Sequence, residues 1–443
     1  MADMRDHETD QPQQTTAVSR DRFLRQVGQG AIAGAAAAAL PEVVGPIVAR
    51  AASPAATRTL NVTWYSNVTP LHSWLTLLDG FGKQEGVHVN YIPLPSVFGD
   101  WVQKLTTALS TGYTGYDVLW IDDFMTATFS TAGWLEPLEN SLPKGLPQTA
   151  TPALVQTSTY NGHLYRMPGI ADDVMFFYRK DLFDKAGLSV PRTWQDVVKA
   201  GKALTKGGRY GLGFAGKNGN TELFNELCYW MGQAGADPLH LKTPGARTAL
   251  QFIYDMLHTS KILPPDTVTN DYTSLLAAFQ DGRIAMWPVW DSLLGAALQG
   301  NARIARGALA IGLPPRGPVV GSTITGAGGW SISKYSPNKD LAVKFLEYVT
   351  TNAQEATIAQ LGYSPARTSA LSIGSVAKTL PQAPYLASYA RLNLTRNRPL
   401  GAQAQRISDA LEAVINQYLN QHLTLDAAIT TAQQQIDQIQ QNS

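Results

Sequence analysis

The chain has 443 residues, of which 44% are hydrophobic and 16% charged, so it is long enough to build two hydrophobic cores. Its 35 lysine and arginine residues nearly balance its 34 aspartate and glutamate residues, which excludes the basic excess typical of nucleic-acid-binding proteins. A single cysteine, Cys228, excludes an internal disulfide framework and a cysteine-based metal site. No run approaches the roughly 18 consecutive apolar residues of a membrane span, which excludes a protein with several spans.

The first 51 residues have the pattern of an export signal. A basic segment at 19–25 precedes an apolar run at 27–40 that is rich in alanine and glycine, and a small-x-small sequence follows at 49–51. The basic segment resembles a twin-arginine signal, but Asp21 stands where the second arginine belongs, so the route stays open between a twin-arginine-like and a general secretory signal. An exposed amphipathic helix is the alternative. We expect removal of residues 1–51 and an extracytoplasmic protein, periplasmic or at the cell surface.

Strands and helices alternate in the next part of the chain. Apolar runs predict strands at 60–65, 87–91 and 117–121, and apolar residues at helical spacing predict helices between them. This order predicts a parallel sheet covered by helices, in which ligands bind beyond the carboxyl ends of the strands. The segments that follow the first and third strands are therefore candidates for ligand contact: Ser66, Asn67, Asp122 and Asp123.

A second set of α/β signals begins at an apolar strand predicted over 174–178. Asp181 and Thr193 are predicted to cap two helices, and Gly187 to end the first of them. A strand is predicted at 210–214, and a buried helix at 224–231 would place Cys228 in the core. Two amphipathic helices are predicted to end the chain, at 402–419 and 425–440.

The order of several short motifs along residues 60–439 resembles that of the extracellular solute-binding proteins of ABC importers, in the sugar-binding family that includes the trehalose/maltose-type binding proteins. No single motif is specific, but their joint order and spacing are. The motifs are DVLWID at 117–122, GWLEPL at 133–138, YRMP at 165–168, FYRKDLF at 177–183, PRTW at 191–194, FQDGRIAMW at 279–287, GGW at 328–330, SPNK at 336–339 and GYSPAR at 362–367.

This resemblance implies an α/β, two-lobed periplasmic-binding-protein fold, each lobe a sheet flanked by helices, with three hinge crossovers. Carried over, lobe 1 would comprise 58–169 and 289–333, and lobe 2 would comprise 170–288 and 334–443. The crossovers would lie near Gly169, Pro288 and Ser333. The resemblance also implies a sugar ligand held between the lobes, delivery to the transmembrane subunits of an ABC permease, and no catalysis. We expect a monomer that needs no cofactor or metal and binds no nucleic acid.

Flat aromatic rings are expected to pack on the C–H faces of a sugar. Trp287 and Trp290 flank Pro288, which argues against a regular helix or a central strand there, so we favour ligand or hinge contact over burial in a core. Four other tryptophans lie on predicted helix or strand faces and are expected in the core: Trp64, Trp74, Trp101 and Trp194.

A glycine-rich segment, 326–329, precedes Trp330. Glycines let backbone N–H groups approach a ligand closely, and no phosphate-binding loop pattern follows. By resemblance to the trehalose/maltose-type binding proteins, Gly328, Gly329 and Trp330 are expected to form part of the pocket. Replacing Trp330 with alanine would then lower affinity with little loss of stability.

Carboxylates and arginines make charge-assisted hydrogen bonds to sugar hydroxyls. Asp122–Asp123 and Asp172–Asp173 are two adjacent acidic pairs, and at most one residue of each is expected to face the ligand, preferably Asp122 and Asp173. The alternatives are helix caps and surface charge. Arg367 matches an arginine that reaches the sugar in some family members, and Asn67, Tyr65 and Trp230 are weaker candidates.

Two other functions remain open. A secreted glycoside hydrolase would need two carboxyl groups about 5–10 Å apart, a distance that the sequence cannot give. No hydrolase motif, metal-ligand cluster or nucleophile motif is present in the sequence. A binding protein for a non-sugar solute is the more serious alternative, although the ten tryptophans favour a sugar.

Overall fold

The computed structural model describes residues 58–66, 71–95, 98–293 and 308–442, all within the contact unit formed by residues 52–443. The predicted export signal, residues 1–51, and the candidate Asn67 lie outside the described residues. Among the described residues, no helix combines the length and the apolar character that crossing a membrane requires.

A mixed sheet forms the centre of this unit. Its main path has the strand order β2-β1-β3-β10-β6-β8-β7, and three further strands pair with β6 or β10. The pairings β1–β2, β1–β3 and β7–β8 are parallel, whereas β10 runs antiparallel to both β3 and β6. The strands of this sheet are β1 (Thr59–Tyr65), β2 (His88–Leu94), β3 (Val118–Asp122), β6 (Met167–Arg179), β7 (Tyr210–Leu212), β8 (Ile284–Trp290), β9 (Leu309–Gly312), β10 (Thr323–Ile332), β11 (Ser364–Pro365) and β12 (Thr395–Asn397), and a separate pair is formed by β4 (Thr159–Tyr160) and β5 (His163–Leu164).

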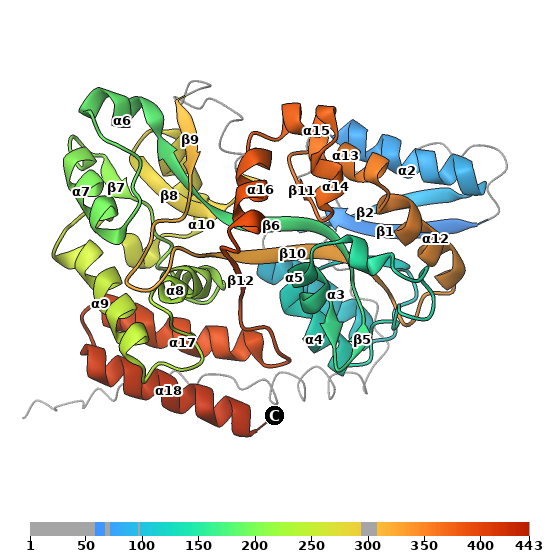
Figure 1. Ribbon diagram of the computed structural model, residues 1–443. Helices are drawn as coiled ribbons and strands as arrows, with labels where there is room; N and C mark the ends of the chain where they lie inside the picture. The colour runs from blue at the N-terminus through green and yellow to red at the C-terminus, as the bar shows by residue number, and fades with distance from the viewer. Residues whose placement is uncertain (1–57, 67–70, 96–97, 294–307, 443) are drawn as a thin grey trace, which may run out of the picture. The chain divides into compact units, whose positions relative to one another are not determined.

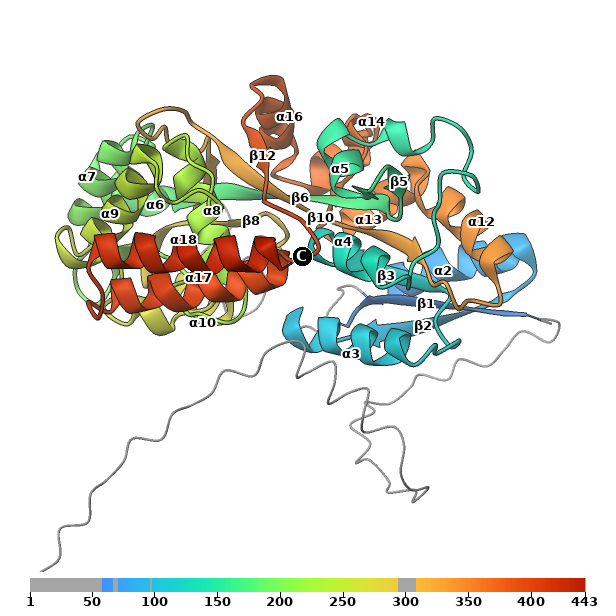
Figure 2. The same ribbon diagram turned by 90° about the horizontal axis from the view of Figure 1, so that it is seen from below.

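Helices cover the sheet on the outside, as Figures 1 and 2 show. The predicted alternation of strands and helices over residues 60–121 is confirmed, and so is the parallel pairing of its three strands. The α-helices are α2 (Leu71–Glu85), α3 (Phe98–Ser110), α4 (Asp123–Thr131), α5 (Pro152–Thr157), α6 (Lys180–Ala186), α7 (Trp194–Leu204), α8 (Glu222–Gln233), α9 (Pro244–His258), α10 (Tyr272–Gln280), α12 (Lys339–Val349), α13 (Asn352–Gln360), α14 (Thr368–Leu371), α15 (Gly374–Thr379), α16 (Ala383–Arg391), α17 (Ala404–Leu419) and α18 (Leu425–Gln441).

Two large hydrophobic cores lie at the two ends of the central strands. The first core joins β1, β3, α2 and α12, and the second joins α7, α8, α9, α17 and α18. The strands β6 and β10 contribute residues to both cores and run between the two groups of helices in Figure 1. This arrangement confirms the predicted α/β class with two lobes.

The residue ranges predicted for lobe 1 (58–169 and 289–333) and lobe 2 (170–288 and 334–443) stay a prediction. The sequence analysis grouped α12 with lobe 2, whereas its buried residues Leu341, Phe345 and Leu346 pack in the first core. The last helices pack as expected in the second core, where α17 and α18 lie side by side in Figure 2.

The helix-end predictions for α6 and α7 have different outcomes. Thr193 caps α7 as predicted, and it forms a capping box with Asp196. Gly187 ends α6 in the left-handed conformation, also as predicted. The prediction for Asp181 is wrong, because Arg179 occupies the N-cap position of α6 and Asp181 lies inside the first turn, where its carboxylate accepts hydrogen bonds from the Arg179 guanidinium.

Pro288 lies within the regular strand β8, contrary to the sequence expectation. Residues of β8 on both sides of Pro288 pair with β6, but its pairing with β7 ends at Met286. Because Pro288 stands beyond that last pair, its missing N–H removes no hydrogen bond to β7. Pro288 is therefore tolerated, because β8 has a paired strand on both sides only up to Met286.

Candidate functional site

One face of the sheet carries polar residues where β3, β10 and β6 meet. Asp122 pairs with Gly328, and Asp172 pairs with Gly326, so both aspartates lie on the same face as these two glycines. Both aspartates are partly buried. Arg398 and Trp290 lie over the same place, because a Cβ atom added to Gly326 would be 3.1 Å from the Trp290 ring and 3.2 Å from Arg398 Nη2. We call the group formed by Asp122, Asp123, Asp172, Trp290 and Arg398 the acidic site.

Gly326 and Gly328 allow large groups to lie directly on the backbone of β10. A Cβ atom at Gly328 would come within 2.1 Å of the Trp120 ring, closer than any real contact. The glycine-rich segment was expected to allow close approach of a ligand. In the structure the approaching groups are the rings of Trp120 and Trp290 and the guanidinium of Arg398.

Arg398 connects elements of the two cores. It follows β12, and its buried guanidinium donates from Nη2 to Asp123 Oδ1 at 2.6 Å and from Nη1 to Asn225 Oδ1 at 2.8 Å. Asp123 begins α4, which contributes Met125 and Phe129 to the first core and Phe124 to the second, and Asn225 belongs to α8 of the second core. Arg398 therefore joins α8 to a helix that packs in both cores, through hydrogen bonds from a charged group.

The Arg398 guanidinium also lies between two aromatic rings. Its central carbon is 4.6 Å from the centroid of the Phe124 ring and 5.0 Å from that of the Trp290 ring. Such cation–π contacts hold a guanidinium in place in addition to its hydrogen bonds. Burial lowers the pKa of Arg398, but the carboxylates of Asp123 and Asp122 outweigh burial and raise it above its ordinary value.

Asp122 ends β3 and caps the next helix, because its Oδ1 accepts a hydrogen bond from the Phe124 N–H at 3.1 Å. Burial raises the pKa of Asp122 well above its ordinary range, and the adjacent carboxylate of Asp123 raises it further. Arg398 Nη2 stands 3.7 Å from Asp122 Oδ1 and opposes this shift only in part. The side chain of Asp122 is 21% exposed, so it is the member of its pair with access to solvent.

Asp172 and Asp291 form a hydrogen-bonded carboxyl pair beside this site. Asp172 accepts hydrogen bonds from Ser292 N–H at 3.1 Å and Ser292 Oγ at 2.9 Å, and Asp291 accepts one from the Asp173 N–H at 3.1 Å. Asp291 also accepts from the hydroxyl of Ser364. Burial raises the pKa of both carboxyls, most strongly that of Asp291, and their mutual hydrogen bond lowers the pKa of Asp172 and raises that of Asp291.

Asp173 lies on the opposite face of β6 from Asp172, where it pairs with Thr325. Burial raises the pKa of Asp173 to about 7. Thus Asp172, and not the preferred Asp173, lies on the face of the acidic site, and from the other pair the site contains both Asp122 and Asp123. Whether either residue contacts a ligand stays a prediction.

The structure places Trp330 in a cluster of rings within the first core. Trp64, Trp74, Trp120 and Trp330, which we call the tryptophan cluster, are each completely buried. The centroid of the Trp330 ring lies 4.6 Å from those of Trp64 and Trp120 and 5.7 Å from that of Trp74. Because no part of Trp330 is exposed, its contacts explain core packing and give no support to ligand contact.

The other candidate tryptophans occupy different environments. Trp287 is 1% exposed and packs against Tyr272 and Phe279, away from the acidic site, although it stands only three residues before Trp290. Trp230 is completely buried beside Trp194 and Phe252 in α8, α7 and α9. Of the three, the structure brings Trp290 alone to the acidic site, and it is half-buried there. The prediction that Trp64, Trp74, Trp101 and Trp194 are core residues is confirmed.

Gly329 and Arg367 also lie apart from the acidic site. A Cβ atom at Gly329 would meet the backbone oxygen of Met167 and the side chain of Arg166, on the opposite face of β10. Arg367 is 2% exposed and forms an ion pair with the buried Glu355, and its Nε donates to Thr149 Oγ1 at 2.7 Å. These contacts make Arg367 a connector between loops and α13.

Sequence reasoning missed Arg398, Asp291 and Tyr363. Arg398 lies in a segment without helical or strand periodicity, and its partners Asn225 and Asp123 are 173 and 275 residues away. Tyr363 stacks on Tyr65 with ring centroids 5.6 Å apart, which places the weaker candidate Tyr65 beside it. Tyr363 lies in the GYSPAR motif, and nothing in that motif indicates this stacking.

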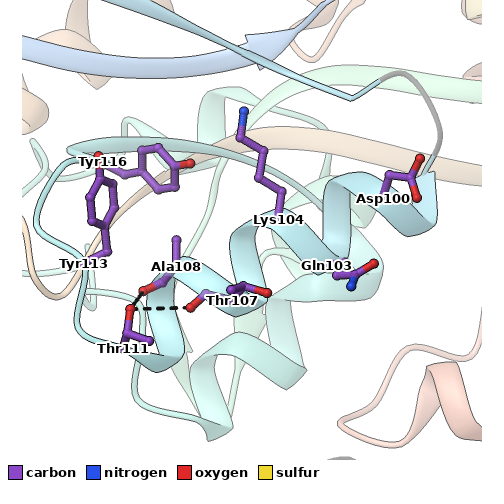
Figure 3. Close-up of a pocket in the computed structure, with 8 residues that line it drawn as sticks. All are labelled: Asp100, Gln103, Lys104, Thr107, Ala108, Thr111, Tyr113 and Tyr116. Carbon is purple, nitrogen blue, oxygen red and sulfur yellow. Dashed lines mark hydrogen bonds between the residues drawn. The ribbon is translucent and has the colours of Figure 1, made fainter. Parts of the chain in front are cut away.

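A second feature to consider is a surface pocket of about 570 Å³ on α3 and the loop after it (Figure 3). Figure 3 shows Tyr113 and Tyr116 at one end, with Lys104, Gln103 and Asp100 along the helix. Lys104 Nζ already donates to the backbone oxygen of Pro93 at 2.8 Å, and the Thr111 hydroxyl is bonded within its own turn. No set of polar groups converges here as it does at the acidic site.

The described residues contain no group of three or more histidine, cysteine, aspartate or glutamate side chains placed to hold a metal ion. Cys228 is buried, and burial raises the pKa of its thiol, so it has the surroundings of a core residue.

Comparison with known proteins adds independent findings. Residues 65–356 match the family described as bacterial extracellular solute-binding protein. A probable ABC transporter-binding protein of Deinococcus radiodurans is 24% identical over 379 residues, which cover 82% of this chain and 89% of that protein. The mannitol-binding protein of Pseudomonas aeruginosa is 29% identical over 195 residues, covering 42% of this chain and 44% of that protein.

Solved structures show the same fold. Maltose-bound T. maritima MalE3 has a TM-score of 0.77 at 24% identity, over 86% of this chain and 99% of that chain. A solute-binding protein of Agrobacterium vitis with bound D-mannitol has a TM-score of 0.69 at 26% identity, over 87% of this chain and 98% of that chain. Each likeness extends over more than four fifths of this chain.

Proposed function

This chain belongs to the bacterial extracellular solute-binding protein family, and on that premise we propose that it is the extracytoplasmic binding subunit of an ABC importer, with a sugar or a polyol as its ligand. The family is one of binding proteins and not of enzymes. Its relatives include proteins named for mannitol and maltodextrin binding, and similar structures hold maltose and mannitol. We propose that this chain binds without catalysis and delivers its ligand to a membrane permease.

The observation that carries the proposal is the convergence of hydroxyl-binding and aromatic groups at the acidic site. Asp122 and Asp172 come from two different strands, and Arg398 and Trp290 come from two further segments. Carboxylates and a guanidinium bind hydroxyl groups strongly, and the half-buried indole of Trp290 offers an apolar surface for the C–H groups of the same ligand. A small polar solute needs this combination, and the surface pocket on α3 does not offer it.

The two cores suggest how binding is coupled to transport. Residues of the acidic site come from elements of both cores, so a ligand that contacts Asp122 and Trp290 together would favour the arrangement in which the cores are close. The ligand shifts this equilibrium by its differential affinity for the two arrangements. The closed form would then be the one that the permease recognises.

The alternative of a glycoside hydrolase finds little support. Such an enzyme needs two carboxyl groups free for a water and a glycosidic oxygen. Asp291 is not free, because it accepts hydrogen bonds from the Asp173 N–H and from the Ser364 hydroxyl, so Asp172 and Asp291 do not form such a pair. A non-sugar solute is the remaining alternative, and a thermal-shift panel of sugars and polyols separates it from a sugar.

The test is a thermal-shift panel of the full chain with mannitol, sorbitol, glucose, trehalose, maltose and maltotriose. A ligand at about 100 times its dissociation constant should stabilise the protein by about 2.7 kcal/mol, which shifts Tm by several degrees. Asp122→Asn should reduce the shift, whereas Asp184→Asn, an exposed aspartate in a surface pair with Lys180, should not. Chromatography of the bound sugar should show no breakdown. A panel without any shift would contradict a sugar or polyol ligand, and product formation would contradict a binding protein.

A further inference from the structure

Two tyrosines, Tyr65 and Tyr363, meet above the strands that carry the acidic site. Tyr65 ends β1, and Tyr363 directly precedes β11. Their rings stack with centroids 5.6 Å apart and an angle of 16° between the ring planes. Both residues are partly buried. We call Tyr65 and Tyr363 the tyrosine pair.

The two tyrosines come from strands on opposite sides of the acidic site. In the sheet, β1 lies next to β3, and β10 and β6 follow. The strand β11 lies on the far side of β6 from β10, because Ile170 and Ala171 pair with both strands. From β1 to β11 there are four strand spacings, about 19 Å in all at roughly 4.8 Å each. The two rings cross this distance from both ends and meet over the strands between them, where β10 carries Gly326 and Gly328.

The strand register places the tyrosine pair beside two carboxyl groups of the acidic site. The pairing of β1 with β3 puts Tyr65 one residue short of the level of Asp122. The pairing of β11 with β6 puts Tyr363 at the level of Asp172. Two hydroxyl groups and two carboxyl groups therefore converge from four segments of the chain.

The pKa values of the two phenol hydroxyls agree with this placement. Burial raises the pKa of Tyr65 well above its ordinary value, and Tyr363 and Asp122 raise it further. Burial likewise raises the pKa of Tyr363, and Asp172 raises it further. Both hydroxyls therefore stay protonated at neutral pH and can donate hydrogen bonds.

Neither hydroxyl of the tyrosine pair donates a hydrogen bond to an acceptor in the described part of the chain. Other tyrosines do: Tyr91 donates to the backbone oxygen of Tyr65 at 2.5 Å, and Tyr389 donates to that of Gly312 at 3.0 Å. The contacts of the pair with Trp64, at 5.5 and 5.8 Å between ring centroids, need the two rings but not their hydroxyls. The two O–H groups are thus left for a ligand or for water.

A hydroxyl group on a ligand matches this set of protein groups. Its oxygen accepts a hydrogen bond from a tyrosine, and its proton is donated to a carboxyl oxygen of Asp122 or Asp172, which accepts whether the carboxyl is charged or neutral. A solute without hydroxyl groups could not use both kinds of partner. The half-buried ring of Trp290 remains for the apolar C–H groups of the same ligand.

We propose that Tyr65 and Tyr363 are ligand-binding residues that select hydroxylated solutes, each donating its phenol O–H to a ligand hydroxyl oxygen beside Asp122 and Asp172. This inference rests on the proposed function, since it specifies how the same site recognises its ligand. It gives the tyrosine pair, and not the completely buried Trp330, the ligand contact expected next to the glycines of β10.

Isothermal titration calorimetry on the full chain tests this proposal, with whichever of mannitol, sorbitol, glucose, trehalose, maltose and maltotriose gives the largest thermal shift. Tyr65→Phe and Tyr363→Phe each remove one hydroxyl and keep the ring. Each should therefore weaken binding about tenfold, as the loss of one hydrogen bond does, and leave the melting temperature of the ligand-free protein unchanged. Tyr113→Phe, at the exposed tyrosine of the surface pocket, is the matched control and should bind like the unmodified chain.

Ligands that lack one hydroxyl provide the second measurement. Monodeoxy forms of the same compound are titrated into the unmodified chain and into both variants. Removing the ligand hydroxyl that Tyr363 binds should cost about tenfold in the unmodified chain and little in Tyr363→Phe, because the hydrogen bond is already gone there. A merely structural effect of the substitution would weaken every deoxy form equally.

The outcomes distinguish this inference from the proposed function. Unchanged affinity in either Tyr65→Phe or Tyr363→Phe, or a loss of affinity that comes with a lower melting temperature of the ligand-free protein, would overturn the ligand-binding role and leave a sugar-binding function in place. Binding of no compound in the panel by the unmodified chain would overturn the proposed function, and this inference with it.

Discussion

The tryptophan cluster and the acidic site lie on the same face of the same strands, two residues apart. On β3, Trp120 belongs to the cluster and Asp122 to the site, and on β10 the corresponding residues are Trp330 and Gly328. The cluster is completely buried and consists of rings in contact, whereas the site is partly exposed and holds a cation, several carboxyls and one aromatic ring. The same sheet face is thus core at the Trp120–Trp330 pair and candidate binding surface at the next pair on that face, Asp122–Gly328.

This difference shows what the glycines of β10 contribute. At Trp330 the strand carries a large side chain that fills the core, and at Gly328 and Gly326 it carries none, which leaves room for Trp120, Trp290 and Arg398 from other segments. The cluster is held by ring packing, since the indole N–H groups of Trp64, Trp74 and Trp330 find no acceptor among the described residues. The site is held by charge and hydrogen bonds.

The largest expected effect comes from removing a ring of the cluster. Trp330→Ala should lower the free energy of unfolding by about 3–5 kcal/mol, because it leaves a cavity between Trp64, Trp74 and Trp120. Denaturant unfolding measures this loss, and Trp330→Phe should show a smaller one. The expectation from the sequence is a loss of affinity with little loss of stability. That outcome would contradict the burial of Trp330 and would make it a ligand contact.

Removing the guanidinium should destabilise the protein by a comparable amount. Arg398→Met leaves the buried carboxylate of Asp123 without its partner, which typically costs about 3–5 kcal/mol. The double variant with Asp123→Asn removes both charges and should recover a large part of the loss. If the two single losses simply add in the double variant, the ion pair does not link the two cores energetically.

A smaller loss of stability is expected from adding a side chain at Gly328, which lies between the tryptophan cluster and the acidic site. The Cβ of Gly328→Ala would lie 2.1 Å from the Trp120 ring, and displacing that ring should cost about 1–3 kcal/mol. Gly374→Ala, where a Cβ meets nothing within 4 Å, is the matched control and should be neutral or slightly stabilising. Equal melting temperatures for the two variants would show that Trp120 does not lie where the structure places it.

The last effect concerns pH. The pKa of Asp173 is raised to about 7 by burial, whereas an unfolded aspartate has a pKa of about 3.9. Between these values the native state binds more protons than the unfolded state, so stability should fall as pH rises from about 4 to about 7 and level off above that. The raised pKa values of Asp172 and Asp291 act in the same direction.

Melting temperatures across this pH range test that slope, at about 1.4 kcal/mol for each unit by which a pKa is raised. Asp173→Asn should flatten the slope, and the exposed Asp184→Asn should leave it as it is. A slope that is the same in Asp173→Asn and in the unmodified chain would mean that other groups titrate in this window.

Much of the fold could be predicted because its signals are local. The capping box of Thr193 and Asp196, the left-handed Gly187 and the alternation of three strands with two helices each depend on residues close together in the chain. The wrong prediction for Pro288 also came from a local signal. Pro288 looked like a strand breaker because its pairing on only one side is invisible in the sequence.

The candidate site was predicted less completely because it is assembled from distant segments. Asp122 could be predicted as a site residue because it comes directly after a buried strand. The choice between Asp172 and Asp173 depends on the register of β6 against β10, which the sequence does not show. Arg398 carries no local pattern at all. Trp287 and Trp290 are indistinguishable in sequence, yet β8 places one in a core and the other at the acidic site.

The central claim is that the solute binds at the acidic site, and hydrogen–deuterium exchange with and without a bound sugar tests it most directly. The account predicts slower exchange at the backbone amides of Phe124, Asp173 and Ser292 and in the segment around Arg398, with no change along α3. Slower exchange confined to residues 100–116, around the surface pocket of Figure 3, with the acidic site unaffected, would contradict it.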